Sequence, residues 1–190
     1  MLYTRKGDNG TTKLFRKNLD AFGCDQRISK SSSVAEALGS LDEINSFLGL
    51  CKVKSEENKK LKIENRKFGE IIHEIQQTLF IIQAELAGAE KHVIEEKVMD
   101  LETITDLIEK TLPPIKTFFI SGGTELGAMF DVARTIARRA ERRVVQVSEE
   151  SSGLVGPETL KYLNRLSSIL YALARLTNHL SGITEESPSY

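Results

Sequence analysis

Five long segments of the chain repeat apolar side chains at the spacing of one helical face. The first begins in the Ser31–Ser33 run, where Ser33 precedes Glu36 by the spacing of a capping box. Its apolar stripe then continues from Val34 to Leu48. The other four segments are expected over Lys60–Ala89, Ile94–Thr111, Glu125–Val147 and Pro157–Ser181. Because all five are amphipathic and little strand signal separates them, they predict an all-α protein, a five-helix antiparallel bundle.

The segments outside these helices have a different character. Residues 1–30 are polar and show no helical periodicity, and the turn signals within Lys6–Gly10 predict an ordered loop. Residues 31–181 make up the predicted bundle, in which Lys52–Lys59 is expected to be a connection between helices. Residues 182–190 are expected to be a frayed tail. The 190 residues are too few for two full domains and predict a single one.

Composition narrows the classes of partner. A net charge of −1 provides no overall field to attract nucleic acid or an anionic membrane, and the absence of Trp argues against a base-stacking platform.

Cys24 and Cys51 lack metal or redox spacing, so free thiols are expected. Without a secretory signal or a membrane-spanning run, the sequence predicts a cytoplasmic protein. His73, His92 and His179 show no ligand spacing, so no protein-built metal site is expected.

The N-terminal loop contains the residue types that bind polyphosphate. Glycines let backbone N–H groups approach closely, threonines add donors, and Arg or Lys supplies positive charge. The stretch from Thr4 to Lys13 contains all three kinds, although not in the order of a Walker A loop. It therefore predicts a nucleotide triphosphate site. A surface turn that is rich in Gly and Thr is the alternative.

A second candidate anion site lies in the segment Arg134–Arg143, which contains five arginines and a single acidic residue. Arg134, Arg138 and Arg142 recur every four residues and share one strip of an ideal helix. Glu141 lies beside this strip and is able to orient the guanidinium groups. Because guanidinium binds phosphate in a bidentate manner, the strip predicts an anion site. A solvated charged face, or an inter-helix salt-bridge strip, is the alternative.

Other polar residues on the helices have plainer interpretations. On the first helix, Asp42 borders the apolar stripe and needs a partner if it is buried, and Asn45 is expected to hydrogen-bond to another helix. The segment Ile115–Thr124 is a short apolar run, too short for a helix, that closes with two glycines. On the last helix, an ordinary polar face is expected from Asn164, Tyr171, Arg175 and Asn178.

Together, these segments resemble the PduO-type ATP:cob(I)alamin adenosyltransferases over nearly the whole chain. The resemblance is carried, in the order found in the family, by YTRKGDNGTT, RISK, EALGSLDEINSFLG, FFISGGT, ARTIARRAERRVV and YLNRLSSILYALAR. Members are five-helix bundles that form homotrimers with active sites between subunits. They transfer the 5′-deoxyadenosyl group of ATP to the cobalt of cob(I)alamin and release triphosphate. The resemblance implies this activity here, with Mg²⁺ held mostly by ATP. It also implies a cobalamin reductase and an adenosylcobalamin-dependent enzyme as possible partners.

The resemblance also implies roles for particular residues. Asp42 and Arg134 match a carboxylate–guanidinium pair between subunits. Phe118 matches an aromatic that packs on the corrin and displaces its lower axial base. The resemblance implies that four residues act in the reaction: Asp42, Phe118, Arg134 and Arg138. Ser121 stands where members commonly carry Pro, a change that can alter the loop of Phe118. The residues expected to wrap the ATP phosphates are Thr4, Arg5, Lys6, Gly7, Asp8, Gly10, Thr12 and Lys13. Further ATP contacts are expected from Lys30, Arg138, Arg139, Glu141, Arg142 and Asn164.

Two other functions compete with the transferase. A non-catalytic bundle could bind ATP or a corrinoid, and a plain structural trimer would need neither. Phe118 favours the enzyme, because a protein that only binds nucleotide needs no corrin-facing aromatic. Arg139 faces away from the strip of Arg134, so its assignment rests on the resemblance alone.

Overall fold

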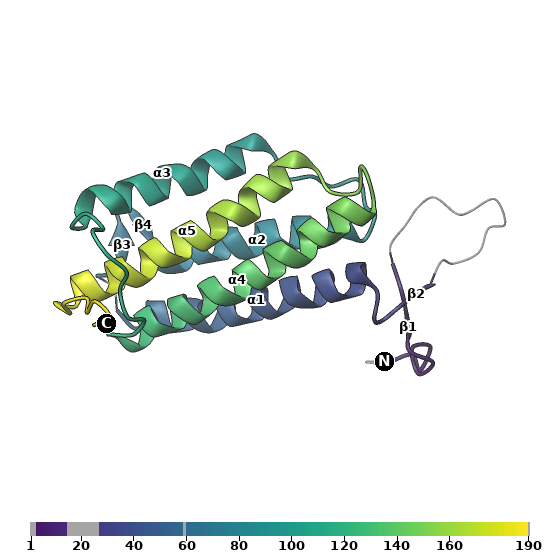
Figure 1. Ribbon diagram of the computed structural model, residues 1–190, viewed down its shortest axis with the longest axis horizontal. Helices are drawn as coiled ribbons and strands as arrows, with labels where there is room; N and C mark the ends of the chain where they lie inside the picture. The colour runs from purple at the N-terminus through teal and green to yellow at the C-terminus, as the bar shows by residue number, and fades with distance from the viewer. Residues whose placement is uncertain (1–2, 15–26, 59, 190) are drawn as a thin grey trace.

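The computed structural model describes residues 3–14, 27–58 and 60–189, in which five helices form a bundle beside two short antiparallel ribbons (Figure 1). The helices are α1 (Ser33–Glu56), α2 (Phe68–Leu86), α3 (Glu95–Thr111), α4 (Glu125–Glu150) and α5 (Pro157–Leu180). The ribbons pair β1 (Thr11–Lys13) with β2 (Arg27–Ser29), and β3 (Lys62–Ile63) with β4 (Arg66–Lys67). The predicted all-α, five-helix bundle is confirmed.

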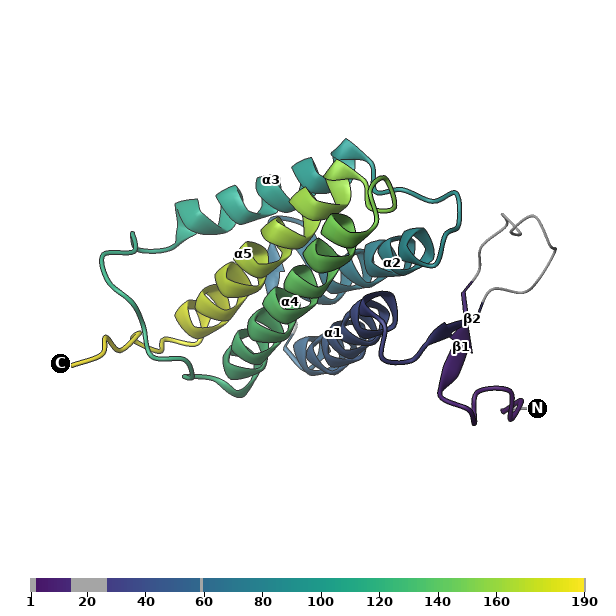
Figure 2. The same cartoon turned by 45° about the vertical axis from the view of Figure 1, so that its right-hand side comes forward.

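The bundle is held by the apolar stripes that the sequence pattern indicates. α4 packs along α5 and α1, α1 packs on α2, and α3 packs on α5 (Figure 2). Phe68 of α2 and Phe130 of α4 meet edge to face, with ring centroids 6.2 Å apart. On α4 the fully buried positions include Ala133, Ala137 and Ala140, whose small side chains allow a close approach of neighbouring helices. The arginines of α4 occupy its other faces.

The predicted boundaries of the first two helices were partly wrong. α1 continues to Glu56, through part of the expected connection. α2 begins at Phe68 rather than Lys60, because the residues before it form the β3–β4 ribbon with Glu64 at a positive φ of 51°. Arg66 fixes this ribbon, since its guanidinium lies 2.8 Å from Asp100 of α3. Antiparallel pairing, with the turn at Glu64 and this ion pair to α3, therefore replaces the first turns of the predicted helix.

Two local hydrogen bonds also differ from the prediction. Ser32, not Ser33, caps α1 and accepts from the backbone N–H of Ala35 at 3.3 Å. Ser33 instead donates to Glu150, which lowers the pKa of that carboxyl. Asn45 does join α2, but through its backbone oxygen, which accepts from the side chain of Gln76 at 3.0 Å. The Asn45 Oδ1 atom is buried and has no partner among the described residues.

The ends of the bundle carry different structures. The β1–β2 ribbon projects beyond the start of α1, whereas the loop from α3 to α4 and the C-terminus lie at the opposite end of the bundle (Figures 1 and 2). We call residues 3–14 the N-terminal loop and residues 112–124 the pocket loop. In the part of the chain that the structure describes, no helix is both long and apolar enough to cross a membrane.

Candidate functional site

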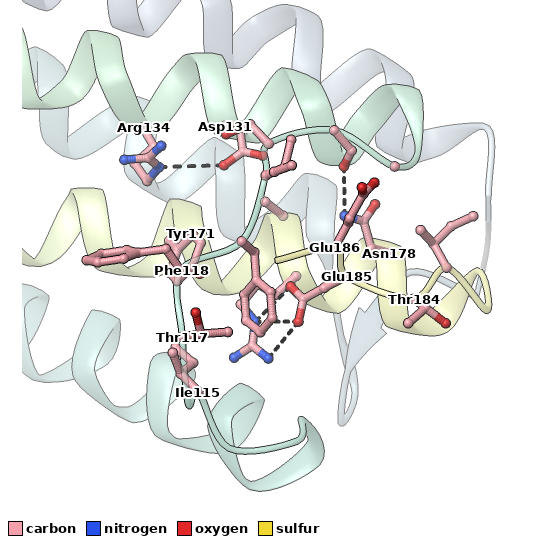
Figure 3. Close-up of a pocket in the computed structure, with 18 of the residues that line it drawn as sticks. Ile115, Thr117, Phe118, Asp131, Arg134, Tyr171, Asn178, Thr184, Glu185 and Glu186 are labelled. Atoms are coloured by element: carbon pink, nitrogen blue, oxygen red, sulfur yellow. Dashed lines mark hydrogen bonds and ion pairs between the residues drawn. The ribbon is translucent and has the colours of Figure 1, made fainter. Parts of the chain in front are cut away.

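A pocket of about 850 Å³ opens between α4, α5, the pocket loop and the C-terminal tail, residues 182–189 (Figure 3). Phe118, Phe119 and Ile120 of the pocket loop line one side. The helices contribute polar groups, among them Asp131, Arg134, Arg138, Tyr171, Arg175 and Asn178. An apolar loop thus faces charged and hydrogen-bonding groups across a space large enough for a sizeable ligand.

Phe118 is the most exposed large apolar side chain of the described residues, at 79%. Ile115 and Ile120 of the same loop are 51% and 55% exposed. Neighbouring exposed apolar side chains at the rim of a pocket are typical of a binding surface. This position fits the predicted role of Phe118 as a residue that packs on a flat apolar ligand, and that role stays a prediction.

Arg134 lies on the α4 side of the pocket between an acidic and an aromatic residue. Its Nε is 3.6 Å from Asp131 Oδ1, and its guanidinium carbon is 5.8 Å from the centre of the Tyr171 ring (Figure 3). The Nε atom is buried and has no hydrogen-bond partner among the described residues. Burial raises the pKa of the Tyr171 phenol, and the nearby Arg175 guanidinium only partly offsets this. The phenol is therefore neutral at physiological pH.

The strip predicted on α4 forms an exposed surface next to this pocket. Arg138 and Arg142 are both exposed, and an Arg142 Nη1 hydrogen bond of 3.0 Å to the Arg138 backbone oxygen fixes the second side chain. Asn164 of α5 donates to Glu141 at 3.0 Å, which links the strip to α5. The structure thus brings together Arg134, Arg138, Glu141, Arg142 and Asn164 along α4 and α5. Their contact with ATP stays a prediction.

Arg139 is not part of this strip. Its guanidinium forms an ion pair with Glu43 of α1, and one turn further on Arg143 lies 3.5 Å from Glu36 of the same helix. Both arginines therefore join α4 to α1. Within one chain, the predicted ATP ligand Arg139 thus lies in an ion pair between two helices. This agrees with its position on the helix, which points it away from Arg134.

The predicted pair of Asp42 and Arg134 is not formed within the described chain. Asp42 is exposed on α1 and has no ion-pair partner among the described residues, while Arg134 is near Asp131 instead. The described part of the chain thus leaves the Asp42 carboxylate open to a group from a second chain. The expectation of a pair between subunits is therefore left as a proposal.

The N-terminal loop is folded around one arginine. Arg27 of β2 donates to Thr11 Oγ1 at 2.7 Å, to the Lys6 backbone oxygen at 2.7 Å and to the Thr11 backbone oxygen at 2.9 Å. The Lys30 N–H donates to Gly10 at 2.9 Å. A Cβ placed on Gly7 would lie 3.2 Å from Lys30 Nζ, so the absence of a side chain makes room for this ammonium group.

The other loop residues predicted to wrap phosphate surround this hydrogen-bonded turn. Gly10 takes a positive φ of 77°, which a glycine adopts without strain. The side chains of Thr4, Arg5, Lys6, Asp8 and Lys13 are exposed, and that of Thr12 is half-buried. The structure thus brings Lys30 to the Thr4–Lys13 stretch. It does not bring this loop to Arg138, because the ribbon projects away from the bundle (Figure 2).

Sequence reasoning missed four residues that shape the site. No role was predicted for Arg27 of the RISK segment. An ordinary polar face was expected from Tyr171, Arg175 and Asn178. One signal was available for the α5 residues, since glycines at 123 and 127 indicate a close approach of another group at the start of α4. Nothing local to the sequence identifies which residue makes that approach.

The C-terminal tail is anchored rather than frayed. Arg175 Nη2 lies 2.8 Å from Glu185, and the Ile120 N–H donates to the Glu186 backbone oxygen at 2.8 Å. The prediction of a loose tail was wrong because the buried guanidinium of α5 supplies a charged partner that the tail sequence does not reveal. The tail is one wall of the pocket.

The fold and the pocket define a ligand-binding helical bundle in which an apolar loop faces a strip of arginines. A family model described as "Cobalamin adenosyltransferase" matches residues 2–177. The chain belongs to this family.

Relatives with similar sequences are named corrinoid adenosyltransferases. The Corrinoid adenosyltransferase PduO of Citrobacter freundii is 37% identical over 185 residues, which cover 94% of this chain and 50% of that protein. The chain thus spans about half the length of this relative and of its Salmonella typhimurium counterpart. The Corrinoid adenosyltransferase of Bacillus subtilis is 35% identical over 186 residues, 96% of this chain and 89% of that protein.

A solved structure is also similar along the whole length. It is a variant of the PduO-type ATP:corrinoid adenosyltransferase from Lactobacillus reuteri, complexed with cobalamin and ATP. The identity is 30%, the TM-score is 0.86, and 100% of each chain is covered.

Proposed function

We propose that the chain is an ATP:corrinoid adenosyltransferase, which transfers the 5′-deoxyadenosyl group of ATP to the cobalt of cob(I)alamin and releases triphosphate. The observation that carries the proposal is the junction of the apolar pocket with the arginine strip. Arg134 and Arg138 belong to both, so a corrin in the pocket and a polyphosphate on the strip would meet there. The family membership and the ligands of the similar solved structure support this assignment.

In this reaction the nucleophile is the cobalt itself, so the protein needs only to position the substrates and to stabilise charge. The Co(I) electron pair attacks the ribose 5′-carbon, a Co–C bond forms, and the C–O bond to the departing triphosphate breaks. Negative charge that develops on triphosphate is stabilised by guanidinium and ammonium groups, assigned here to Arg138, Arg142, Lys6 and Lys30. An Mg²⁺ ion carried by ATP would share this charge. Phe118 would pack on the corrin and exclude the lower axial base.

The two halves of the nucleotide site lie apart in one chain, so we propose that a neighbouring chain completes it. The N-terminal loop of one chain would reach the α4 strip of the next in a homotrimer, with Asp42 and Arg134 paired across the contact. Apolar side chains exposed in the single chain support a contact between copies, among them Val132 and Val145 of α4 at 47% and 37%. A rotationally symmetric ring closes such head-to-tail contacts.

We place this protein in the reducing cytoplasm, with a cobalamin reductase before it and an adenosylcobalamin-dependent enzyme after it. The substrate cob(I)alamin must be supplied by a one-electron reduction of cob(II)alamin. The product of the transferase, adenosylcobalamin, is useful only to an enzyme that takes it as a cofactor. Cys51 is a buried free thiol, which agrees with a reducing compartment, and Cys24 lies outside the described residues.

The direct test mixes the protein with MgATP and chemically reduced cob(I)alamin under anaerobic conditions. We expect light-sensitive adenosylcobalamin and triphosphate to form in equal amounts. A reaction without ATP, and one with protein that has been heat-denatured, provide the controls. ATP binding without adenosylcobalamin would refute the transferase and support a non-catalytic nucleotide-binding or corrinoid-binding bundle.

A further inference from the structure

Asn178 of α5 joins the pocket loop to the bundle through three hydrogen bonds. Its Oδ1 accepts from the backbone N–H and from the hydroxyl of Thr124, each at 2.9 Å. Its Nδ2 donates to the Gly122 backbone oxygen at 2.8 Å (Figure 3). The residue is only 7% exposed. All of these bonds end at the junction where the loop becomes α4, so a single side chain fixes this end of the loop.

The backbone around Asn178 is shaped to admit it. A Cβ placed on Gly123 would lie 2.7 Å from Asn178 Oδ1, and one on Gly127 would come closer still. Gly122 and Gly123 also take positive φ values of 138° and 95°. Residues without side chains thus stand wherever the amide needs space, which indicates a built contact rather than a chance one.

Arg175, one turn before Asn178 on α5, fixes the other end of the loop. Its Nη2 donates to the Pro113 backbone oxygen at 3.0 Å, and its guanidinium carbon lies 5.2 Å from the centre of the Phe119 ring. Its remaining hydrogen bonds go to Glu185 of the tail, at 2.8 to 3.0 Å. The guanidinium is 5% exposed, so these contacts are largely shielded from water.

We propose that Arg175 and Asn178 are positioning residues, which hold the two ends of the pocket loop. Phe118 between them then stands at a fixed place beside Arg134 and Arg138, the end of the strip that lines the pocket. The loop has no helix or strand of its own, and it includes two glycines at positive φ. Between its ends, the Ile120 N–H donates to Glu186 of the tail, and Arg175 holds that tail through Glu185. Arg175 and Asn178 therefore support both ends of the loop, and Arg175 also supports the tail that contacts its middle. This proposal rests on the proposed function, because the place of Phe118 matters only if a corrin packs there.

The expected consequence is selective for the corrinoid half of the reaction. A displaced Phe118 would weaken corrinoid binding and misalign the cobalt for attack, since about 1 Å of misplacement can cost about 10²-fold in rate. ATP binding would change little, because the hydrogen bonds of Arg175 and Asn178 go to the pocket loop and the tail and, among the described residues, none goes to the arginines of the strip or to the N-terminal loop. A loss of general stability would not separate the two substrates in this way.

The experiment compares Asn178→Ala with Thr177→Val, a matched change at the neighbouring buried position. The Thr177 hydroxyl donates only to Leu173 of its own helix among the described residues, so its removal leaves the pocket loop anchored. For Asn178→Ala we expect KM for cobalamin to rise about tenfold and kcat to fall about tenfold, with KM for ATP within about twofold of the wild type. Arg175→Lys, which loses the bidentate fork, should shift the same constants in the same direction.

A second variant keeps the proposal testable if Asn178→Ala does not fold. Gly127→Ala removes no hydrogen-bonding group and places a better helix former in α4, but its Cβ would meet both Asn178 Oδ1 and the hydroxyl of its partner Thr124, and so breaks the same contact. We expect the same rise in KM for cobalamin. Unchanged cobalamin and ATP constants in Gly127→Ala or Asn178→Ala, relative to Thr177→Val, would overturn the positioning role.

Hydrogen exchange and corrinoid binding distinguish this proposal from the proposed function. Peptides covering residues 113–124 should exchange about tenfold faster in Asn178→Ala than in Thr177→Val, and hydroxocobalamin should bind about tenfold more weakly. A wild-type chain that makes no adenosylcobalamin refutes the transferase, and these two readouts still decide whether the loop is anchored. Equal exchange in both variants would show that Asn178 does not position it.

Discussion

The pocket loop is anchored by buried side chains of its own chain, whereas the N-terminal loop is held by exposed contacts on a ribbon that projects from the bundle. Arg175 and Asn178 are 5% and 7% exposed, while Arg27, which organises the N-terminal loop, is exposed to solvent. Buried hydrogen bonds are stronger and less screened than exposed ones. The corrin side of the proposed site is therefore preorganised, whereas we propose that the nucleotide side is completed by its ligand and by a neighbouring chain.

The largest effect is expected from Arg138→Ala, which removes charge where the two halves meet. Loss of one charge-stabilising group commonly lowers turnover by about 10² to 10³-fold, and we expect that loss in adenosylcobalamin formation. The fold should be unaffected, because Arg138 is exposed. Circular dichroism and thermal unfolding check this.

The matched control is Arg143→Ala, which changes another exposed arginine of α4 that faces Glu36 of α1 instead of the pocket. Its activity should stay within about threefold of the wild type, since surface ion pairs contribute little. Near-normal turnover in Arg138→Ala would remove this residue from the site.

The helices and the arginine strip were predictable because both follow from periodic spacing within one segment. Arg134, Arg138 and Arg142 recur every four residues, and the structure places them as a helix requires. Local spacing also indicated that Arg139 faces elsewhere, and its ion pair with Glu43 agrees. Features that depend on period alone can be read from sequence with few assumptions.

The anchors of both loops were not predictable, because their partners are distant in sequence. Asn178 is 54 residues from Thr124, and Arg27 is 16 residues from Thr11. The β3–β4 ribbon was missed for the same reason, since Arg66 finds Asp100 on another helix. A side chain on a helix gives no local sign of which loop it will hold.

Arg27→Ala should produce a smaller effect, confined to the nucleotide half. Without its hydrogen bonds to Lys6 and Thr11, the N-terminal loop loses its folded turn, and we expect KM for ATP to rise about tenfold with KM for cobalamin nearly unchanged. The melting temperature should change little, because Arg27 is exposed and the hydrogen bonds that it loses all go to the N-terminal loop. Steady-state kinetics with each substrate varied in turn measure this, and Lys62→Ala on the other ribbon is the control. A rise in KM for cobalamin instead would contradict the division into two halves.

Tyr171→Phe should have the smallest effect. Burial raises the pKa of this phenol, so the group is already neutral across the pH range in which the enzyme is assayed, and removing it takes away no ionisation. The ring that faces Arg134 is retained. We expect turnover within about twofold of the wild type and the same pH profile from pH ~6 to ~9. Loss of a pH-dependent limb in the variant would show that the phenol ionises during the reaction.

The central claim is that one chain supplies the N-terminal loop and its neighbour supplies the α4 strip. It can be tested by co-expressing two inactive variants with different tags, Arg138→Ala and the combined Arg5→Ala, Lys6→Ala and Thr12→Ala, and purifying trimers that carry both tags. Each mixed trimer then has one site with an intact loop and an intact strip, so we predict about one third of the wild-type adenosylcobalamin formation. Activity no higher than that of the two parents would contradict the claim, because it would mean that both halves come from the same chain.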